Sequence, residues 1–264
     1  MKTQKFLTPT QMLIMAPSIF TKEPSEGVSK HYTHIPTIKV IDDMKTLGWG
    51  VNEVKQVKSR VGIGFQKHLV IFRNEDIVIT GEDGDDVFPQ ILLTNSHDGK
   101  NAFTFTPGLF RLICSNGLVI ATEKFGDVKI RHMGYSFEEL QKEIHEMVEN
   151  LPLTVESMNR MKQAELNQDQ IVKFAKEALE IRFKKDDLKR ISINYMDLVD
   201  PVRKEDKGND LWRVFNIVQE KLIEGDFQYI AGTKVRKARK IKNFNQDIKV
   251  NTDLFALAMS YVKN

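Results

Sequence analysis

The sequence predicts an α+β fold, with an antiparallel strand meander and helices in its N-terminal half and a helical C-terminal half. Short runs rich in β-branched and aromatic residues, separated by turn-forming stretches, fill the first half. In the second half, apolar residues recur with helical spacing. The strand-rich first half followed by a helical second half predicts α+β, and short strands joined by short loops predict an antiparallel meander. The expected organisation is a flexible N-terminal arm (1–30), a strand-rich core (31–135) and a helical region packed on that core (136–264).

The first half contains one predicted helix and several predicted strands. Apolar residues spaced three apart from Ile38 to Leu47 form one helix face, and Gly48 follows where a helix commonly ends. The predicted strands are 51–57, 68–73, 87–94, 101–107 and 128–132. The apolar run 108–114 fits either a helix or a buried strand, because periodicity cannot separate the two over so few residues.

Apolar stripes predict the helices of the second half. Ser136, with Glu139 three residues later, has the pattern of a capping box and precedes a stripe that reaches Leu151. Further stripes at 171–181 and 211–222 predict two more helices. We expect Thr252 to cap the last helix, whose stripe ends at Tyr261.

Composition limits the class of protein. The chain has 264 residues, of which 41% are hydrophobic and 28% charged, as in folded domains. The net charge of +3 is too small to indicate nucleic-acid binding without clustering. Cys114 is the only cysteine, so no disulfide can form within the chain, which favours a reducing compartment. No apolar run reaches the length of a membrane helix. We therefore expect a soluble, cytoplasmic protein with no membrane partner.

The polar stretch Asn95–Gly99 has two readings. It resembles a ligand site for phosphate, a base or a metal, but Asn, Ser, Asp and Gly also cap and turn their own backbone. The six histidines show no metal-ligand spacing, and no glycine-rich phosphate loop is present. No metal or other cofactor is therefore expected. An enzyme that uses His97, Asp98 and Asn116 is a minor alternative.

Clustered basic residues give the stronger binding hypothesis. The run 234–242 has six basic residues in nine, a pattern that favours contact with phosphates. Phe227, Tyr229 and Phe244 lie near this run and either stack on bases or anchor the segment in the core. The candidate nucleic-acid-binding residues are Lys58, Arg60, Asn95, His97, Arg111, Asn116, Lys129, Arg131, Lys234, Arg236, Lys237, Arg239, Lys240 and Lys242.

Several motifs in fixed order resemble the prokaryotic domain-of-unknown-function family 932. The motifs are Asn95–Gly99, Gly108–Leu118, Arg131–Gly134, Trp212–Glu220 and Asn251–Ala258. The chain departs from the family pattern at Gly225-Asp226, where the family usually has two glycines. The resemblance implies a protein of phages, prophages or plasmids, and therefore the bacterial host cytoplasm as its location, but it implies no activity.

The layout of a helix, a strand meander and a long helix is also similar to phage single-strand annealing proteins of the RecT, Redβ and Erf type. That similarity implies a homo-oligomer on single-stranded DNA. The expected function is nucleic-acid binding, with annealing of single strands in recombination as its specific form. The alternative is a phage protein that binds and inhibits or decoys a host defence protein. Enzymatic activity is not expected.

Overall fold

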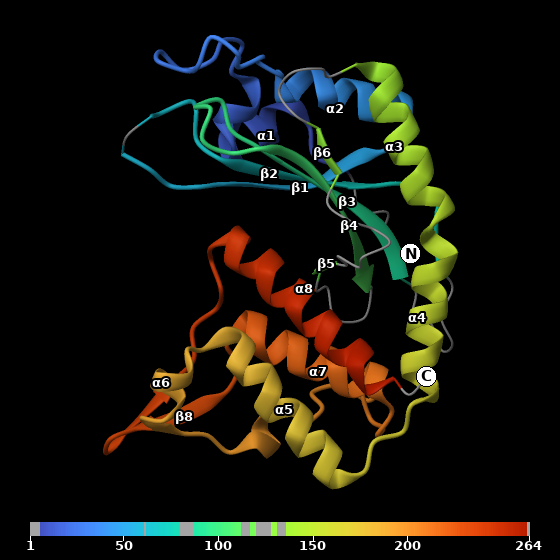
Figure 1. Cartoon of the computed structure of the whole chain (residues 1–264), viewed down its shortest axis with the longest axis vertical. Helices are drawn as coiled ribbons and strands as arrows, with labels where there is room; N and C mark the ends of the chain where they lie inside the picture. The colour runs from blue at the N-terminus through green and yellow to red at the C-terminus, as the bar shows by residue number, and fades with distance from the viewer. Residues whose placement is uncertain are drawn as a thin grey trace. The chain divides into compact units, whose positions relative to one another are not determined.

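The computed structural model describes residues 6–60, 62–79, 87–111, 117–119, 128–130 and 136–262, and its fold is α+β, as predicted (Figure 1). The helices are α1 (Pro9–Met15), α2 (Thr37–Thr46), α3 (Phe137–Glu149), α4 (Leu151–Gln163), α5 (Gln168–Arg182), α6 (Lys185–Leu188), α7 (Leu211–Glu224) and α8 (Phe244–Tyr261), with short 3-10 helices η1 (Pro17–Phe20) and η3 (Tyr195–Leu198). The strands are β1 (Gly50–Gln56), β2 (His68–Arg73), β3 (Val87–Asn95), β4 (Phe103–Arg111), β5 (Gly117–Val119), β6 (Val128–Ile130), β7 (Ile191–Ser192), β8 (Gln228–Ala231) and β9 (Lys234–Lys237).

Contacts divide the chain into two units, one of Met1–Leu112 with Glu123–Leu151 and one of Ile113–Thr122 with Pro152–Asn264.

The sheet of the first unit is the predicted antiparallel meander. Strands β1 to β4 pair in sequence order, and β6 pairs with the start of β4. The register places Val54, Val70, Leu93 and Phe105 side by side across the four strands. All four side chains are buried, as expected for cross-strand apolar pairs on the core face of a sheet. The run 108–114 continues β4 as a strand as far as Arg111.

The core on this sheet also receives the N-terminal helices. Met12 of α1, Ala16 at the C-cap of that helix and Ile19 of η1 are completely buried in it. The prediction of a flexible arm is therefore wrong for this part of residues 1–30. Pro9 stands in the first turn of α1, where its missing N–H costs nothing, and Thr8 caps the helix. Pro17 likewise stands at the start of η1.

Helix α3 belongs to the first unit, and not to the helical region predicted from residue 136. Its apolar stripe, Leu140, Ile144 and Met147, is buried in the same core as the sheet. Ser136 caps the helix as predicted, with its hydroxyl accepting a hydrogen bond from the Glu139 amide at 3.1 Å.

The second unit is mostly helical. Helices α5, α7 and α8 contact one another, and Phe174, Phe215 and Phe255 are their buried aromatic residues. A small antiparallel sheet in the order β7-β8-β9, absent from the sequence prediction, completes the unit. None of the helices in the described part of the chain is both long and apolar enough to cross a membrane.

The prediction that Thr252 caps the last helix is wrong. Helix α8 begins at Phe244, and the Asn243 side chain accepts hydrogen bonds from the amides of Asn245 and Gln246. The first turns of α8 expose mostly polar side chains, so their apolar periodicity is weak. A cap is set by its hydrogen bonds, and here they lie two turns before the stripe becomes evident.

Candidate nucleic-acid interface

The polar stretch Asn95–Gly99 lies at the end of β3 and is largely buried. Asn95 and His97, two of the candidate nucleic-acid-binding residues, are completely buried. The Asn95 amide donates to the Ile35 carbonyl at 3.2 Å and to the Thr37 hydroxyl at 3.0 Å. These bonds satisfy a polar group that would be costly to bury alone. The Asn95 side chain therefore joins the end of β3 to the start of α2, and direct contact of Asn95 or His97 with nucleic acid would require this segment to open.

His68 stands at the centre of the same polar cluster. Its Nδ1 donates to the Gln66 carbonyl at 2.9 Å, and the Thr37 hydroxyl therefore donates to Nε2 at 2.8 Å. Burial lowers the pKa of His68 to about 4, against a smaller opposing effect of the Gln66 carbonyl. The His97 ring lies 4.6 Å from that of His34 and 5.2 Å from that of His68. Despite these three rings, the described residues contain no group of His, Cys, Asp or Glu able to hold a metal ion.

The minor enzyme hypothesis rested on His97, Asp98 and Asn116. The Asp98 carboxylate accepts hydrogen bonds from the Ser96 hydroxyl at 2.7 Å and the Lys100 amide at 3.1 Å. Asp98 is thus a turn-capping residue, as the second reading of this stretch proposed. Asn116 lies outside the described residues.

Of the other basic candidates of the first half, Lys58 and Arg60 are the ones whose side chains the structure describes. Lys58 and Arg60 are exposed in the loop after β1. Arg111 and Lys129 are described only by their backbone, in β4 and β6. Arg131 lies outside the described residues. The candidate nucleic-acid-binding site is therefore described from the basic run 234–242, all of whose residues the structure describes.

A basic and aromatic groove, here called the hairpin groove, lies beside the β8–β9 hairpin in the second unit. It encloses about 620 Å³ and is lined by Arg182, Phe183, Tyr229, Arg236, Lys237, Ala238 and Arg239. Tyr229 and Arg236 pair directly across the two strands, so their side chains share the face that lines the groove. The groove thus combines four cationic side chains with two aromatic rings.

Arg182 forms the floor of the hairpin groove at the end of α5. Its guanidinium donates to the carbonyls of Leu222 and Arg239 and lies 5.2 Å from the Phe183 ring. Burial lowers the pKa of Arg182, although the guanidinium stays charged in proteins. Arg182 and Phe183 were missed by the sequence analysis because they precede the basic run by about fifty residues and stand at the end of a different element, α5.

The aromatic residues near the basic run divide between the two predicted roles. Phe227 and Phe244 are each 4% exposed and anchor the segment in the core. Tyr229 is partly exposed and contacts Phe183 edge to face at 6.5 Å. Tyr229 is therefore the ring available to a ligand.

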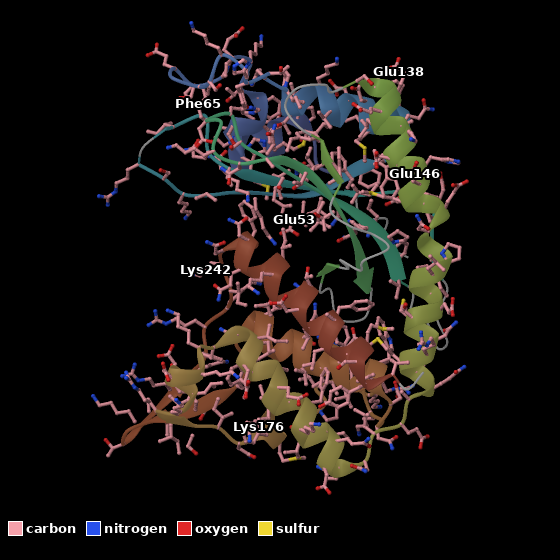
Figure 2. All side chains as sticks on the ribbon, viewed as in Figure 1. Glu53, Phe65, Glu138, Glu146, Lys176 and Lys242 are labelled. Carbon is pink, nitrogen blue, oxygen red and sulfur yellow. The ribbon has the colours of Figure 1, made fainter. Side chains whose placement is uncertain are left out.

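Acidic neighbours balance some of the basic side chains. Lys237 pairs with Asp226 at 2.9 Å, and Lys240 pairs with Glu224 at 2.7 Å. Among the described residues, no carboxylate lies within ion-pair distance of Lys234, Arg236 or Lys242. Figure 2 shows nitrogen-tipped side chains gathered around the orange hairpin, and labels Lys242 on the segment that leads into α8. The uncompensated positive charge thus lies along the hairpin and the segment after it.

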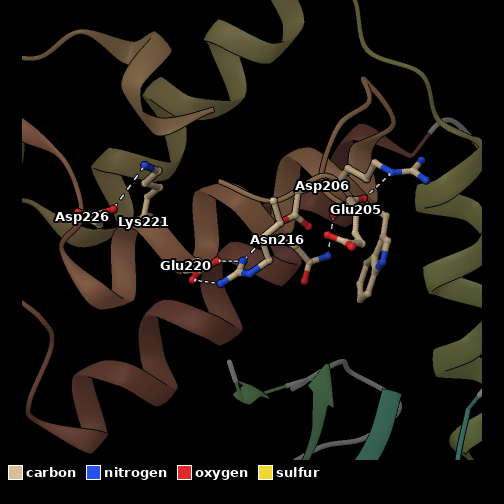
Figure 3. Close-up of polar contacts among 9 residues, drawn as sticks. Glu205, Asp206, Asn216, Glu220, Lys221 and Asp226 are labelled. Atoms are coloured by element: carbon tan, nitrogen blue, oxygen red, sulfur yellow. Dashed lines mark hydrogen bonds and ion pairs between the residues drawn. The ribbon is translucent and has the colours of Figure 1, made fainter. Parts of the chain in front are cut away.

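A second cavity, of about 310 Å³, is lined by charged residues of both signs. Arg203 donates to both carboxylate oxygens of Glu220 at 2.5 Å and to Asp206 at 3.3 Å (Figure 3). The bonds to Glu220 raise the pKa of Arg203. Asp226 is held there by Lys221 and Lys237. Because its charges pair with one another, this cavity has the character of a structural ion-pair network.

The comparisons with known proteins place the chain in a family. Two Escherichia coli K12 proteins, UPF0380 protein YafZ and UPF0380 protein YfjQ, are each 30% identical to it over 258 residues, which is 96% of this chain and 90% of each relative. No solved structure matches, and the layout similarity to annealing proteins gains no support. The family described as "Domain of unknown function (DUF932)" matches residues 24–255. The chain therefore belongs to domain-of-unknown-function family 932, as its motifs predicted.

Proposed function

We propose that the protein binds nucleic acid through the hairpin groove, with single-stranded DNA of a phage or other mobile element as its ligand. The supporting observation is the groove itself, in which Arg182, Arg236, Lys237 and Arg239 surround Tyr229 and Phe183. Proteins that bind single strands combine a positively charged groove with rings on which unpaired bases stack. Annealing in recombination is the specific form of this proposal.

The chemistry of binding divides between the side chains of the groove. Arg236 has a planar guanidinium suited to bidentate contact with phosphate, and it is exposed on β9. Tyr229 lies directly opposite it on β8 and offers a ring to a base. The Arg182 guanidinium already donates hydrogen bonds to two backbone carbonyls, so we assign it a structural role in the groove lining. It also contributes a positive charge to the groove.

The direct test is binding of a fluorescent single-stranded oligonucleotide, measured by anisotropy at about 50 mM salt and then at rising salt up to about 200 mM. The logarithm of the binding constant should fall linearly with the logarithm of salt concentration, because bound cations are released from phosphates. Undetectable binding at the lowest salt would contradict the proposal. Light scattering on the same samples tests the expected homo-oligomer.

The variant Arg236→Ala should weaken binding roughly tenfold, as expected for loss of a charged hydrogen bond. It should also reduce the salt slope by about 0.7, the value for one phosphate of a single strand. Lys176→Ala is the matched control, because Lys176 is exposed on the outside of α5 (Figure 2). Equal losses in the two variants would mean that general charge, and not the groove, determines binding.

Asp226→Asn should strengthen binding several-fold and steepen the salt slope by about 0.7. The Asp226 carboxylate holds Lys237 at 2.9 Å, so its removal frees that cation for a phosphate. Asp226 stands where the family pattern usually has a second glycine. The control Asp253→Asn removes the same charge from the Lys249–Asp253 pair of α8 and should change affinity much less. Unchanged affinity of Asp226→Asn would show that Lys237 does not contact the ligand.

A further inference from the structure

Strand β9 is an edge of the three-stranded sheet, and no strand among the described residues pairs with its outer side. It is the outer strand in the order β7-β8-β9, and all four of its side chains are exposed. The Ala238 amide donates to the Phe227 carbonyl at 2.9 Å, which makes Phe227–Ala238 a hydrogen-bonded pair. Such pairs alternate with non-bonded pairs along an antiparallel ladder. The backbone N–H and C=O groups of Val235 and Lys237 therefore point away from β8, towards the open edge.

The side chains along this edge alternate in character. Lys234 and Arg236 lie two residues apart and so project from one face of the sheet. Val235 projects from the other face, where it pairs across the strands with Ile230. Both apolar side chains are unusually open, with 65% of Val235 and 47% of Ile230 exposed. An added strand would extend this apolar row on one face and meet two cations on the other.

A second copy of β9 fits this edge poorly. Two such strands side by side would bring lysine and arginine side chains next to one another, and like charges on neighbouring strands are destabilising. Basic side chains on an edge strand are a common protection against self-pairing. The occupant that complements the edge is instead a strand of opposite charge.

We propose that β9 binds an extended segment of another protein in which acidic and apolar residues alternate. The added strand accepts hydrogen bonds from the N–H groups of Val235 and Lys237 and donates hydrogen bonds to their C=O groups. It places acidic side chains beside Lys234 and Arg236. Its intervening apolar residue packs beside Val235 and Ile230. The peptide and a nucleic acid would share Arg236 and so compete, but binding of the peptide at the backbone edge does not require that the hairpin groove binds nucleic acid.

The test uses nuclease-treated protein and a fluorescent peptide of alternating glutamate and valine, with binding followed by anisotropy. A second peptide of the same sequence carries N-methyl groups on alternate amides, which removes the edge hydrogen bonds and keeps the charge. The first peptide should bind roughly tenfold more tightly than the second, as expected for lost hydrogen bonds. No binding of the first peptide, or equal binding of both, overturns the proposal, because equal binding means that charge alone attracts the peptide.

Variants of the protein test the same interaction by changing β9 and keeping the peptide unchanged. Val235→Pro removes an N–H that points outward, a position where an edge strand tolerates proline, and should lower peptide affinity roughly tenfold. Val235→Thr keeps the amide and the strand preference and should retain most of the binding. Unchanged affinity of Val235→Pro overturns the proposal. If Val235→Pro fails to fold, the peptide pair still decides the question on the unchanged protein.

Discussion

Acidification from about pH 7 to about pH 4 is expected to remove about 3 kcal/mol of the free energy of unfolding through His68. Burial lowers the pKa of His68 to about 4 in the folded protein, whereas an unfolded histidine titrates near 6.5. Between these values the unfolded chain binds more protons, so stability falls as the pH decreases. The contribution of His68 is fully present above the unfolded pKa, and it is lost once the pH reaches the folded pKa.

The cause of this effect lies in the hydrogen bonds around the ring. A proton on Nε2 would replace the acceptor of the Thr37 hydroxyl by a second donor, and Thr37 in turn accepts from Asn95. Protonation therefore disturbs a chain of bonds that joins α2 to the end of β3. An NMR titration of the His68 ring measures its pKa directly, and a value near 6.5 would contradict the prediction.

Urea unfolding across the same pH range supplies the matched comparison. His68→Gln should be less stable at neutral pH and should show a shallower loss of stability in acid. His31→Gln changes an exposed histidine of the same unit and should keep the pH dependence of the unchanged protein. A pH dependence of His68→Gln equal to that of the unchanged protein would assign the acid effect to other groups.

The polar cluster around His68 also shows which features of the fold local sequence patterns predict and which they do not. Strands such as His68–Arg73 are evident from local composition, and the structure has them at the predicted bounds. The burial of Asn95 and His97 could not be predicted in the same way. Polar side chains are buried where the surrounding structure supplies hydrogen-bond partners for them. The NH2 group of Asn95 donates to Ile35 and Thr37, about sixty residues away in the chain. No local pattern contains that information.

The hairpin groove shows the same limit in the second unit. The basic run was visible as charge, but strand β9 within it was not, because four exposed side chains show no apolar alternation. Strand β8 is equally short, with only Gly232 and Thr233 between the two strands. The sequence therefore predicted a binding segment, whereas Arg182, Phe183 and the faces of the hairpin needed the tertiary structure.

Gly225→Ala is expected to lower the free energy of unfolding by more than about 2 kcal/mol and to distort the hairpin groove. Gly225 ends α7 in the left-handed conformation, with φ of 75°, which costs a residue with a side chain about 1–2 kcal/mol. A Cβ atom there would lie 2.5 Å from the Arg239 carbonyl carbon and 2.8 Å from the Lys240 nitrogen. Backbone atoms cannot rotate away from the new Cβ atom as the end of a flexible side chain can. The segment after β9 must therefore move. Urea unfolding and oligonucleotide anisotropy measure the two consequences.

Gly232→Ala is the control that separates strain from contact. Gly232 also has a positive φ, 62°, but a Cβ atom there would meet nothing within 4 Å. Gly232→Ala should therefore show the conformational cost alone, about 1–2 kcal/mol, and leave the groove unchanged. The difference between the two variants measures how tightly the end of α7 packs against Arg239. Because Arg182 donates to the carbonyls of Leu222 and Arg239, the same displacement should break the bonds that form the floor of the groove. Equal stability losses in the two variants would show that this packing does not hold the groove in place.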